Sequence, residues 1–510
     1  MRDPEESETG YDDASVEPGV WRYARASRAS VVVDAADYFR LMRKAMCEAK
    51  QRALLIGWDF DTRIHLAPGR RWWQKFRSKE TPSRLGSFIL WLTRHNRDLE
   101  IRILRWGYGA IKFMGRGSMA LDLLRWWPHR RIDFEFDTAH PTGASHHQKI
   151  AIIDDDFAVC GGIDMTTHRW DTREHKEHDP RRRRPRGMKY GPWHDATMMI
   201  EGDAARALRH LGEDRWRRAG GPELDPVEPA ERSAWPDELE PQFEDVEIGI
   251  ARTRGEFDDT TEISEIAELF ERQIAEAKHF IYAESQYFAS RRIAEALCKR
   301  LSEDDPPEIF IVHPAHADGW LEQQAMDHAR VELVRTLGAC DDKGRFNLYV
   351  AYTGETPIYT HAKIMIVDDE ILRIGSANMN NRSLGLDSEC DVFIDSRRKG
   401  NGHAAAGIAR LRHSLLAEHC GLEIEEVPGM LARYGSMAEM VERIGTGRGR
   451  TLRRYELPEL NGVQEAVAES GLLDPERPED LFEPFAKGGL FGNDSRLHAL
   501  RKRITERKRN

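Results

Sequence analysis

Cysteine is scarce in this chain, and no two cysteines stand at the spacing of a metal-binding or redox pair. The 510 residues include six, namely Cys47, Cys160, Cys298, Cys340, Cys390 and Cys420. Zinc sites and thiol redox motifs commonly use a Cys-x-x-Cys pair, which is absent here. We therefore expect reduced thiols, no disulfide framework and no metal site.

Long apolar runs and a basic N-terminal leader are also missing. The run Phe88–Leu92 is far shorter than the stretch of about 18 apolar residues that a membrane span requires. Residues 1–18 are acidic and polar, whereas a secretory signal has a basic region followed by an apolar one. The formal net charge of -11 gives no support to a general nucleic-acid-binding protein. We expect a cytoplasmic monomer without a nucleic-acid partner, either soluble or bound peripherally to a membrane.

What the chain does contain is a repeated pattern of polar, reactive residues. The segment His147–Asp154 reads HQKIAIID, and the segment His361–Asp368 reads HAKIMIVD. A constant offset of 214 aligns the histidines, lysines and aspartates, and it also aligns Gly161 with Gly375. Two such patterns in one register indicate an internal duplication.

The segments around both motifs repeat as well. A helical pattern over 35–50 is followed by a strand pattern over 53–58, and 264–278 is followed in the same way by 280–283. Alternating strands and helices predict an α/β fold, here as two duplicated α/β/α lobes with a pseudo-twofold active site at their interface. The expected organisation is a disordered acidic tail (1–18), a first lobe (19–218), a linker rich in proline and acidic residues (219–247), a second lobe (248–425) and a mainly helical extension with a basic tail (426–510).

The motif itself favours phosphodiester chemistry. Histidine and lysine stand two residues apart, so on a strand both side chains point to one face. Two lysines suit the negative charge that develops on a phosphate diester, and two histidines suit covalent and acid–base catalysis without a cofactor. The candidate catalytic residues are His147, Lys149, Asp154, His361, Lys363 and Asp368. Within this set, the position of each aspartate, five residues past its lysine, indicates a structural role on the opposite face or in a turn.

A catalytic histidine also needs an acceptor that fixes its tautomer. The segments 195–200 and 389–394 are strand-like, each begins with an acid, and they align at an offset of 194. Asp195 and Glu389 are therefore the candidate orienting carboxylates. The smaller offset means that about 20 extra residues stand in the first lobe, over 171–191. They include the run Arg181–Arg184, which is either a solvated loop or a contact for lipid headgroups.

The paired motifs resemble those of the phospholipase D superfamily. Further stretches resemble its eukaryotic-type branch, and these are Ser145–Lys149, Gly161–Asp164, Arg169–Asp171, Pro192–Asp195, Ile281–Phe288 and Gly375–Ser383. The resemblance covers roughly residues 30–425. One departure is Ser285, which stands where the branch usually has asparagine.

The resemblance implies the bilobal phospholipase D fold and a phosphohistidine intermediate that water or a primary alcohol resolves. It implies His147 as the nucleophile and His361 as the acid and base. Phosphoryl oxygens would be bound by Lys149, Lys363, Ser376 and Asn378. Asp164 is the first-lobe counterpart of Asn378, and Glu284 and Gln286 either line the pocket or begin a loop.

The leading hypothesis is a phospholipase D that acts at a phospholipid membrane surface and releases phosphatidic acid and an alcohol. Three alternatives stay open. They are a cardiolipin-synthase-like transferase, a nuclease or other phosphodiesterase of the same superfamily, and an inactive lipid-binding scaffold.

Overall fold

The computed structural model describes residues 17–67, 81–106, 118–141, 143–229, 231–258, 260–316, 320–446 and 449–457. Most of the predicted acidic tail and the basic end of the predicted C-terminal extension lie outside these ranges. Within them, no helix combines the length and the apolar character that crossing a bilayer requires.

The first half of the chain forms a mixed sheet in the order β4-β3-β2-β5-β6-β8-β1. The pairs among β2, β3 and β4 are parallel, and the other pairs are antiparallel. Its strands are β1 (Arg22–Val33), β2 (Arg52–Gly57), β3 (Glu100–Trp106), β4 (Ile132–Asp137), β5 (Ile150–Ile153), β6 (Phe157–Gly161) and β8 (Ala196–Glu201).

The second half continues the same sheet in the order β9-β18-β17-β16-β11-β12-β13. Antiparallel pairing of β1 with β9 joins the halves, so the strand order on one side of this seam mirrors that on the other. These strands are β9 (Phe243–Arg254), β11 (Phe280–Glu284), β12 (Glu308–Val312), β13 (Phe346–Thr353), β16 (Ile364–Val367), β17 (Ile371–Gly375) and β18 (Glu389–Asp395). The short strands β10 (Ile263–Ser264) and β14 (Thr356–Pro357) pair with β9 and β13.

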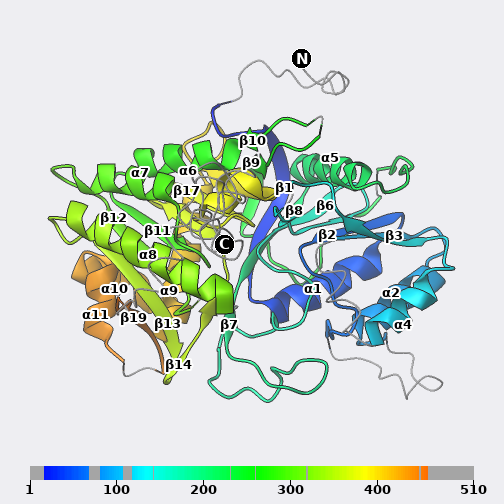
Figure 1. The fold of residues 1–510 in the computed structure, drawn as a ribbon, viewed down its shortest axis with the longest axis horizontal. Coiled ribbons are helices and arrows are strands. Elements are labelled where there is room, and N and C mark those ends of the chain that lie inside the picture. The colour runs from blue at the N-terminus through cyan, green and yellow to red at the C-terminus, as the bar shows by residue number, and fades with distance from the viewer. Residues whose placement is uncertain are drawn as a thin grey trace, which may run out of the picture.

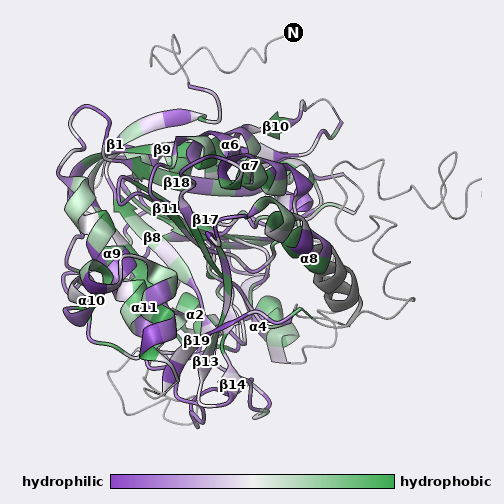
Figure 2. Cartoon of the chain, turned by 90° about the vertical axis from the view of Figure 1, so that its left-hand side faces the viewer, coloured by the Kyte–Doolittle hydropathy of each residue, from purple (hydrophilic) through white to green (hydrophobic). Residues whose placement is uncertain are grey.

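Helices cover both faces of the sheet (Figure 1). One core packs α5 and α9 against strands of both halves, and two further cores pack α1, α2 and α4 in the first half and α6, α7 and α8 in the second. Figure 2 shows α9 and α11 with both hydrophobic and hydrophilic stripes, as expected of helices with one face on a core. The helices are α1 (Ala35–Glu48), α2 (Leu85–His95), α4 (Ser118–Trp126), α5 (Asp203–Arg218), α6 (Glu265–Glu276), α7 (Arg291–Leu301), α8 (Trp320–Cys340), α9 (Ala404–Cys420), α10 (Glu426–Tyr434) and α11 (Met437–Ile444).

The predicted α/β class is confirmed, and two predicted boundaries differ from the structure. The central strand β9 begins at Phe243, inside the expected linker, because the acidic residues there alternate with core residues such as Val246. After α11, the strand β19 (Arg450–Arg454) pairs with β13, so this part of the expected helical extension completes the sheet of the second half.

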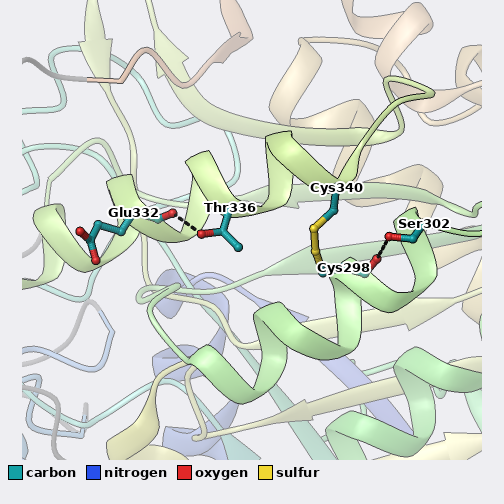
Figure 3. Close-up of a disulfide and its surroundings, with 5 residues drawn as sticks. All are labelled: Cys298, Ser302, Glu332, Thr336 and Cys340. Carbon is teal, nitrogen blue, oxygen red and sulfur yellow. Dashed lines mark hydrogen bonds between the residues drawn. A yellow bond between two sulfur atoms is a disulfide. The ribbon is translucent and has the colours of Figure 1, made fainter.

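The expectation of reduced thiols is wrong for one pair. Cys298 of α7 and Cys340 of α8 form a disulfide, with their Cα atoms 5.5 Å apart (Figure 3). Forty-two positions separate the two cysteines, and only the side-by-side packing of the two helices brings them together. The other cysteines of the described residues are free.

Removing this disulfide is expected to destabilise the second half. Closing a loop of this length restricts the unfolded chain, so the double variant Cys298→Ala/Cys340→Ala should lose about 4 kcal/mol of unfolding free energy. Urea denaturation would measure the loss. Cys47→Ala removes an exposed free thiol and serves as the control, with a change within about 0.5 kcal/mol. Equal midpoints for the double variant and the parent would refute the expectation.

Candidate active site

The two motif histidines meet at the junction between the halves, and each contacts an acid of the opposite half. The Nδ1 atom of His147 lies 3.0 Å from both carboxylate oxygens of Glu389. The Nδ1 atom of His361 lies 2.7 Å from Oδ2 of Asp195. The structure thus brings together the residues predicted from the repeat, in pairs that cross between the halves.

Backbone pairing explains this crossing. The amide of His147 donates to the carbonyl of Ser388, and the amide of His361 donates to the carbonyl of His194. In the second case β15 (Tyr359–Thr360) runs parallel to β7 (Trp193–His194) just before the histidine. Each histidine therefore enters the site beside the residue that precedes the other half's acid.

His361 is buried, His147 is partly buried, and the pKa of each imidazole is lowered well below its usual value. Burial lowers the pKa of His147 well below its usual value, and the ammonium groups of Lys149 and Lys363 lower it further. Burial, then Lys363, then the guanidinium of Arg169 lower the pKa of His361 in the same way. A neutral imidazole that donates Nδ1–H to a carboxylate keeps a lone pair on Nε2, as a nucleophile or base requires.

Each lysine lies just before a strand and contacts the backbone of the histidine in its own motif. The Nζ atom of Lys149 donates to the carbonyl of His147 at 2.7 Å and lies 3.4 Å from Oδ2 of Asp164. The Nζ atom of Lys363 donates to the carbonyl of His361 and, at 3.1 Å, to Oε1 of Gln286. Burial lowers the pKa of Lys363, and the carboxylate of Asp195 partly offsets this shift.

Hydroxyl groups hold Glu389 in place. Ser376 donates to Oε2 at 2.5 Å, and Ser383 donates to Oε1 at 2.7 Å. Burial raises the pKa of Glu389 to about 8. We expected the hydroxyl of Ser376 to bind a phosphoryl oxygen, but in the structure it donates to the carboxylate of Glu389. Ser383 had no role in the sequence analysis, because only the π-helical turn η4 (Arg382–Leu386) aims it at Glu389.

Two other predicted residues, Asn378 and Glu284, have different environments in the structure. The Oδ1 atom of Asn378 is buried without a hydrogen-bond partner among the described residues, so it is available to a ligand. Glu284 does not line the pocket as one of our expectations had it. Its carboxylate is buried and bonds to His194, His419 and the hydroxyl of Tyr282.

The aspartates that close the motifs lie at the far ends of β5 and β16, away from the histidines. The carboxylate of Asp154 accepts the amides of residues 50, 51 and 52, and that of Asp368 accepts the amides of residues 278, 279 and 280. Both aspartates adopt left-handed backbone conformations, with φ of 52° and 54°. This geometry corrects their inclusion among the catalytic residues and agrees with the structural role that their spacing indicated.

Replacing Asp154 is expected to affect stability more than turnover. Asp154→Ala removes the acceptor of three backbone amides, one of them buried, and should cost about 3 kcal/mol of unfolding free energy, measured by urea denaturation. The rate per folded molecule should stay within about twofold, because the carboxylate does not reach the site. Asp98→Ala, on the exposed turn before β3, is the control and should change neither quantity. A rate loss above tenfold at unchanged stability would contradict this assignment.

Aromatic rings flank both histidines, which the sequence analysis had not singled out. Trp58 packs edge-on against His147 with ring centroids 6.5 Å apart, and it stacks on Trp106. Trp193 lies over His361 with centroids 5.1 Å apart, and Tyr359 stacks on Trp193. Such walls restrict the access of water to the imidazoles.

Behind Asp195 lies a buried group of residues that could hold a metal ion, namely Asp34, His175, His194 and Glu418. Oε1 of Glu418 is 2.9 Å from Nε2 of His175 and 2.8 Å from Nδ1 of His194. The oxygens of Asp34 lie 3.4 and 3.5 Å from the same two nitrogens. Our expectation of no metal site overlooked this group, because its members come from four separate segments of the chain.

Protons on the two histidines also offset the negative charge of the carboxylates in this group. The remaining nitrogens of the two histidines contact carboxylates, Nδ1 of His175 that of Asp171 and Nε2 of His194 that of Glu284. Carboxylates in these positions are typical both of metal-bound histidines and of buried imidazolium ions. Despite burial, the neighbouring carboxylates raise the pKa of His175 to about 9, and they also raise that of His194 well above its usual value. Two protons or one divalent cation would therefore balance the same charges.

Comparisons with known proteins point in one direction. A family model described as "Cardiolipin synthase, PLD-like domain" matches residues 270–409. Phospholipase D A of Dictyostelium discoideum is 24% identical over 485 residues, which cover 79% of this chain and 36% of that protein. Phospholipase D1 of Schizosaccharomyces pombe is 27% identical, with 55% of this chain and 28% of that protein covered. The matches thus span well under half the length of these two curated relatives.

The fold has a counterpart among solved structures. Phosphatidylserine synthase of Haemophilus influenzae superposes with a TM-score of 0.53 at 12% identity, over 87% of this chain and 91% of that one. At this identity the likeness concerns the fold alone.

Proposed function

The chain belongs to the phospholipase D superfamily, and on that premise we propose that it is a phospholipase D. Its reaction is the hydrolysis of the distal phosphodiester bond of a glycerophospholipid to phosphatidic acid and a free alcohol. One observation carries the proposal. Two neutral imidazoles meet between two lysines, and each is oriented by a carboxylate from the opposite half.

The proposed first step forms a phosphohistidine. Nε2 of His147 attacks phosphorus, and the bond from phosphorus to the headgroup oxygen breaks. The bound anionic phosphate favours a protonated His361, which passes its proton from Nε2 to the leaving oxygen. Lys149 and Lys363 stabilise the charge that develops on the non-bridging oxygens.

The second step resolves the intermediate. His361, now neutral, takes a proton from water, the oxygen of water attacks phosphorus, and the phosphorus–nitrogen bond breaks to regenerate His147. A primary alcohol in place of water would yield a phosphatidyl alcohol by the same route.

A direct test uses purified protein, mixed liposomes and 1-butanol, with the products resolved by mass spectrometry. We expect phosphatidic acid and phosphatidylbutanol together, because both arise from one intermediate. Absence of both products, with folded protein, would overturn the proposal.

The description of the matching family model supports one competing activity. A cardiolipin-synthase-like enzyme would use phosphatidylglycerol as the acceptor, so liposomes of phosphatidylglycerol alone would yield cardiolipin in place of phosphatidic acid. Incubation with plasmid DNA tests the nuclease alternative in the same series.

A further inference from the structure

Exposed apolar side chains are concentrated on two segments of the first half. Among the described residues, five large apolar side chains are exposed, and four of them are Leu121, Leu124, Trp127 and Met188. The first three lie on α4 and directly after it, and Met188 lies in the segment between Asp171 and Gly191. Single exposed apolar residues are common on protein surfaces, but a stripe of three on one short helix indicates a contact surface.

The geometry of α4 separates two adjacent tryptophans. Met119 and Trp126 are buried, and Trp126 packs near Phe134 of β4, whereas Leu121, Leu124 and Trp127 are 56, 66 and 89% exposed. The exposed residues recur every three positions, so they share one side of the helix. Trp127 is therefore free to enter another apolar medium without disturbing the core.

Basic residues surround this stripe. Arg94, Arg125 and Arg130 are exposed around it, and burial, then Arg131, then Arg94 lower the pKa of the neighbouring His129. The acid of α4, Asp122, is buried and bonds to Arg84 and Thr62. A chain with a net charge of -11 thus presents a locally positive rim around exposed leucines and a tryptophan.

The segment between Asp171 and Gly191 also combines an exposed apolar side chain with exposed basic ones. Met188 is 56% exposed, and Arg183, Arg184 and Lys189 around it are exposed as well. Arg182, by contrast, is buried and bonds to the carboxylate of Asp171, so it anchors the segment from inside. The run Arg181–Arg184, which the sequence analysis had treated as one surface feature, therefore contains one buried residue and three exposed ones.

In Figure 1, α4 and the segment 171–191 lie toward the bottom of the view, and the segment leads into β7. Trp193 of β7 packs over His361, so the segment 171–191 leads directly to a residue that contacts a catalytic histidine.

We propose that the α4 stripe, its arginine rim and the loop around Met188 form a face that docks on a phospholipid bilayer containing anionic lipid. This inference rests on the proposed function, since a phospholipase D must reach a substrate held in a membrane. Tryptophan and leucine suit the headgroup–acyl boundary, and basic side chains are attracted by anionic headgroups. Each arginine near such a surface is worth about fivefold in binding.

Vesicle sedimentation tests the proposal without turnover if all variants carry His147→Ala. Vesicles of phosphatidylcholine with 30 mol% phosphatidylglycerol, about one anionic lipid in three, are compared with pure phosphatidylcholine. Leu121→Ser/Leu124→Ser/Trp127→Ser should bind both at least tenfold more weakly, whereas Leu457→Ser, a change at an exposed leucine of the other half, should bind normally. Arg125→Glu/Arg130→Glu should lose at least about 25-fold on the anionic vesicles only, and Arg443→Glu on α11 is the control for a charge reversal elsewhere on the surface.

Several outcomes would overturn the proposal. They are equal binding by the triple variant and the parent, equal loss in Leu457→Ser, or a change of oligomeric mass in the triple variant, which would mean that a second copy covers the stripe. If the triple variant does not fold, acyl-brominated lipids provide a second measurement. They should quench the parent more than Trp127→Phe, and equal quenching would refute the docking face.

Failure of the docking face is separable from failure of the proposed function. Hydrolysis of a monomeric short-chain phospholipid by the triple variant in the catalytically intact background should stay within twofold of the parent. Loss of vesicle binding with intact short-chain hydrolysis supports the face. Intact vesicle binding without any hydrolysis by the parent would refute the phospholipase D activity and leave the face standing.

Discussion

His147→Ala is expected to lower kcat for headgroup release by at least ~10⁴-fold and to abolish the phosphoenzyme. The reason is that the imidazole supplies the atom that bonds to phosphorus, and no neighbouring group can replace it. In the proposed mechanism, Nε2 of His361 is engaged in proton transfer with the leaving oxygen and with water. Stopped-flow or quenched-flow assays with a phosphate-labelled lipid would measure both quantities.

His361→Ala is the matched comparison and distinguishes the two histidines. Loss of a general acid slows departure of an alkoxide by about 10²- to 10⁴-fold but matters little for a nitrophenolate, which leaves without a proton. A nitrophenyl ester of phosphatidic acid should therefore still label His147 in this variant, and the label should persist because hydrolysis lacks its base. Labelling of His147→Ala in place of His361→Ala would reverse the assignment of nucleophile and acid.

Glu389→Gln is expected to reduce kcat by about 10²- to 10⁴-fold with little change in KM. Glutamine can present its amide N–H to Nδ1 of His147, which moves the imidazole proton to Nε2 and removes the nucleophilic lone pair. In the parent, burial raises the pKa of Glu389 to about 8, so kcat should rise as pH increases through that value and the carboxyl loses its proton. This limb of the pH profile should be missing in the variant.

Asp391→Asn is the matched control for this prediction. Asp391 lies two residues along the same strand and is equally buried, but it accepts the amide of Ala377 and faces Arg373 instead of a histidine. Its replacement should lower stability and leave the pH profile of kcat in place. Equal loss of kcat in both variants would indicate a packing effect of β18 and would contradict the orienting role of Glu389.

The repeat made much of the site predictable. A histidine, a lysine and an acid recur in register with apolar strands, so residues far apart in the chain could be assigned to one site from their spacing. The role of Asp154 was also readable, because five positions past a lysine on a four-residue buried strand lead to the turn at its other end. Both features follow from the local geometry of a strand, which can be predicted from the spacing of residues in the sequence.

Contacts between the halves could not be predicted in this way. The repeat aligned Asp195 with Glu389, but only the pairing of β7 with β15 and of His146 with Ser388 puts each acid against the opposite histidine. The hydroxyls of Ser376 and Ser383, the disulfide between α7 and α8, and the cluster around His194 likewise join segments that have no common register.

The duplicated α/β architecture and the residues expected at its centre could be predicted from the sequence alone, because periodicity and register follow from the strand and helix repeat. The folded structure was needed to show which acid contacts which histidine, and which of the adjacent tryptophans, Trp126 or Trp127, is buried. The physical reason is that pairing and burial depend on which surfaces meet, and those surfaces are assembled from segments that lie hundreds of residues apart.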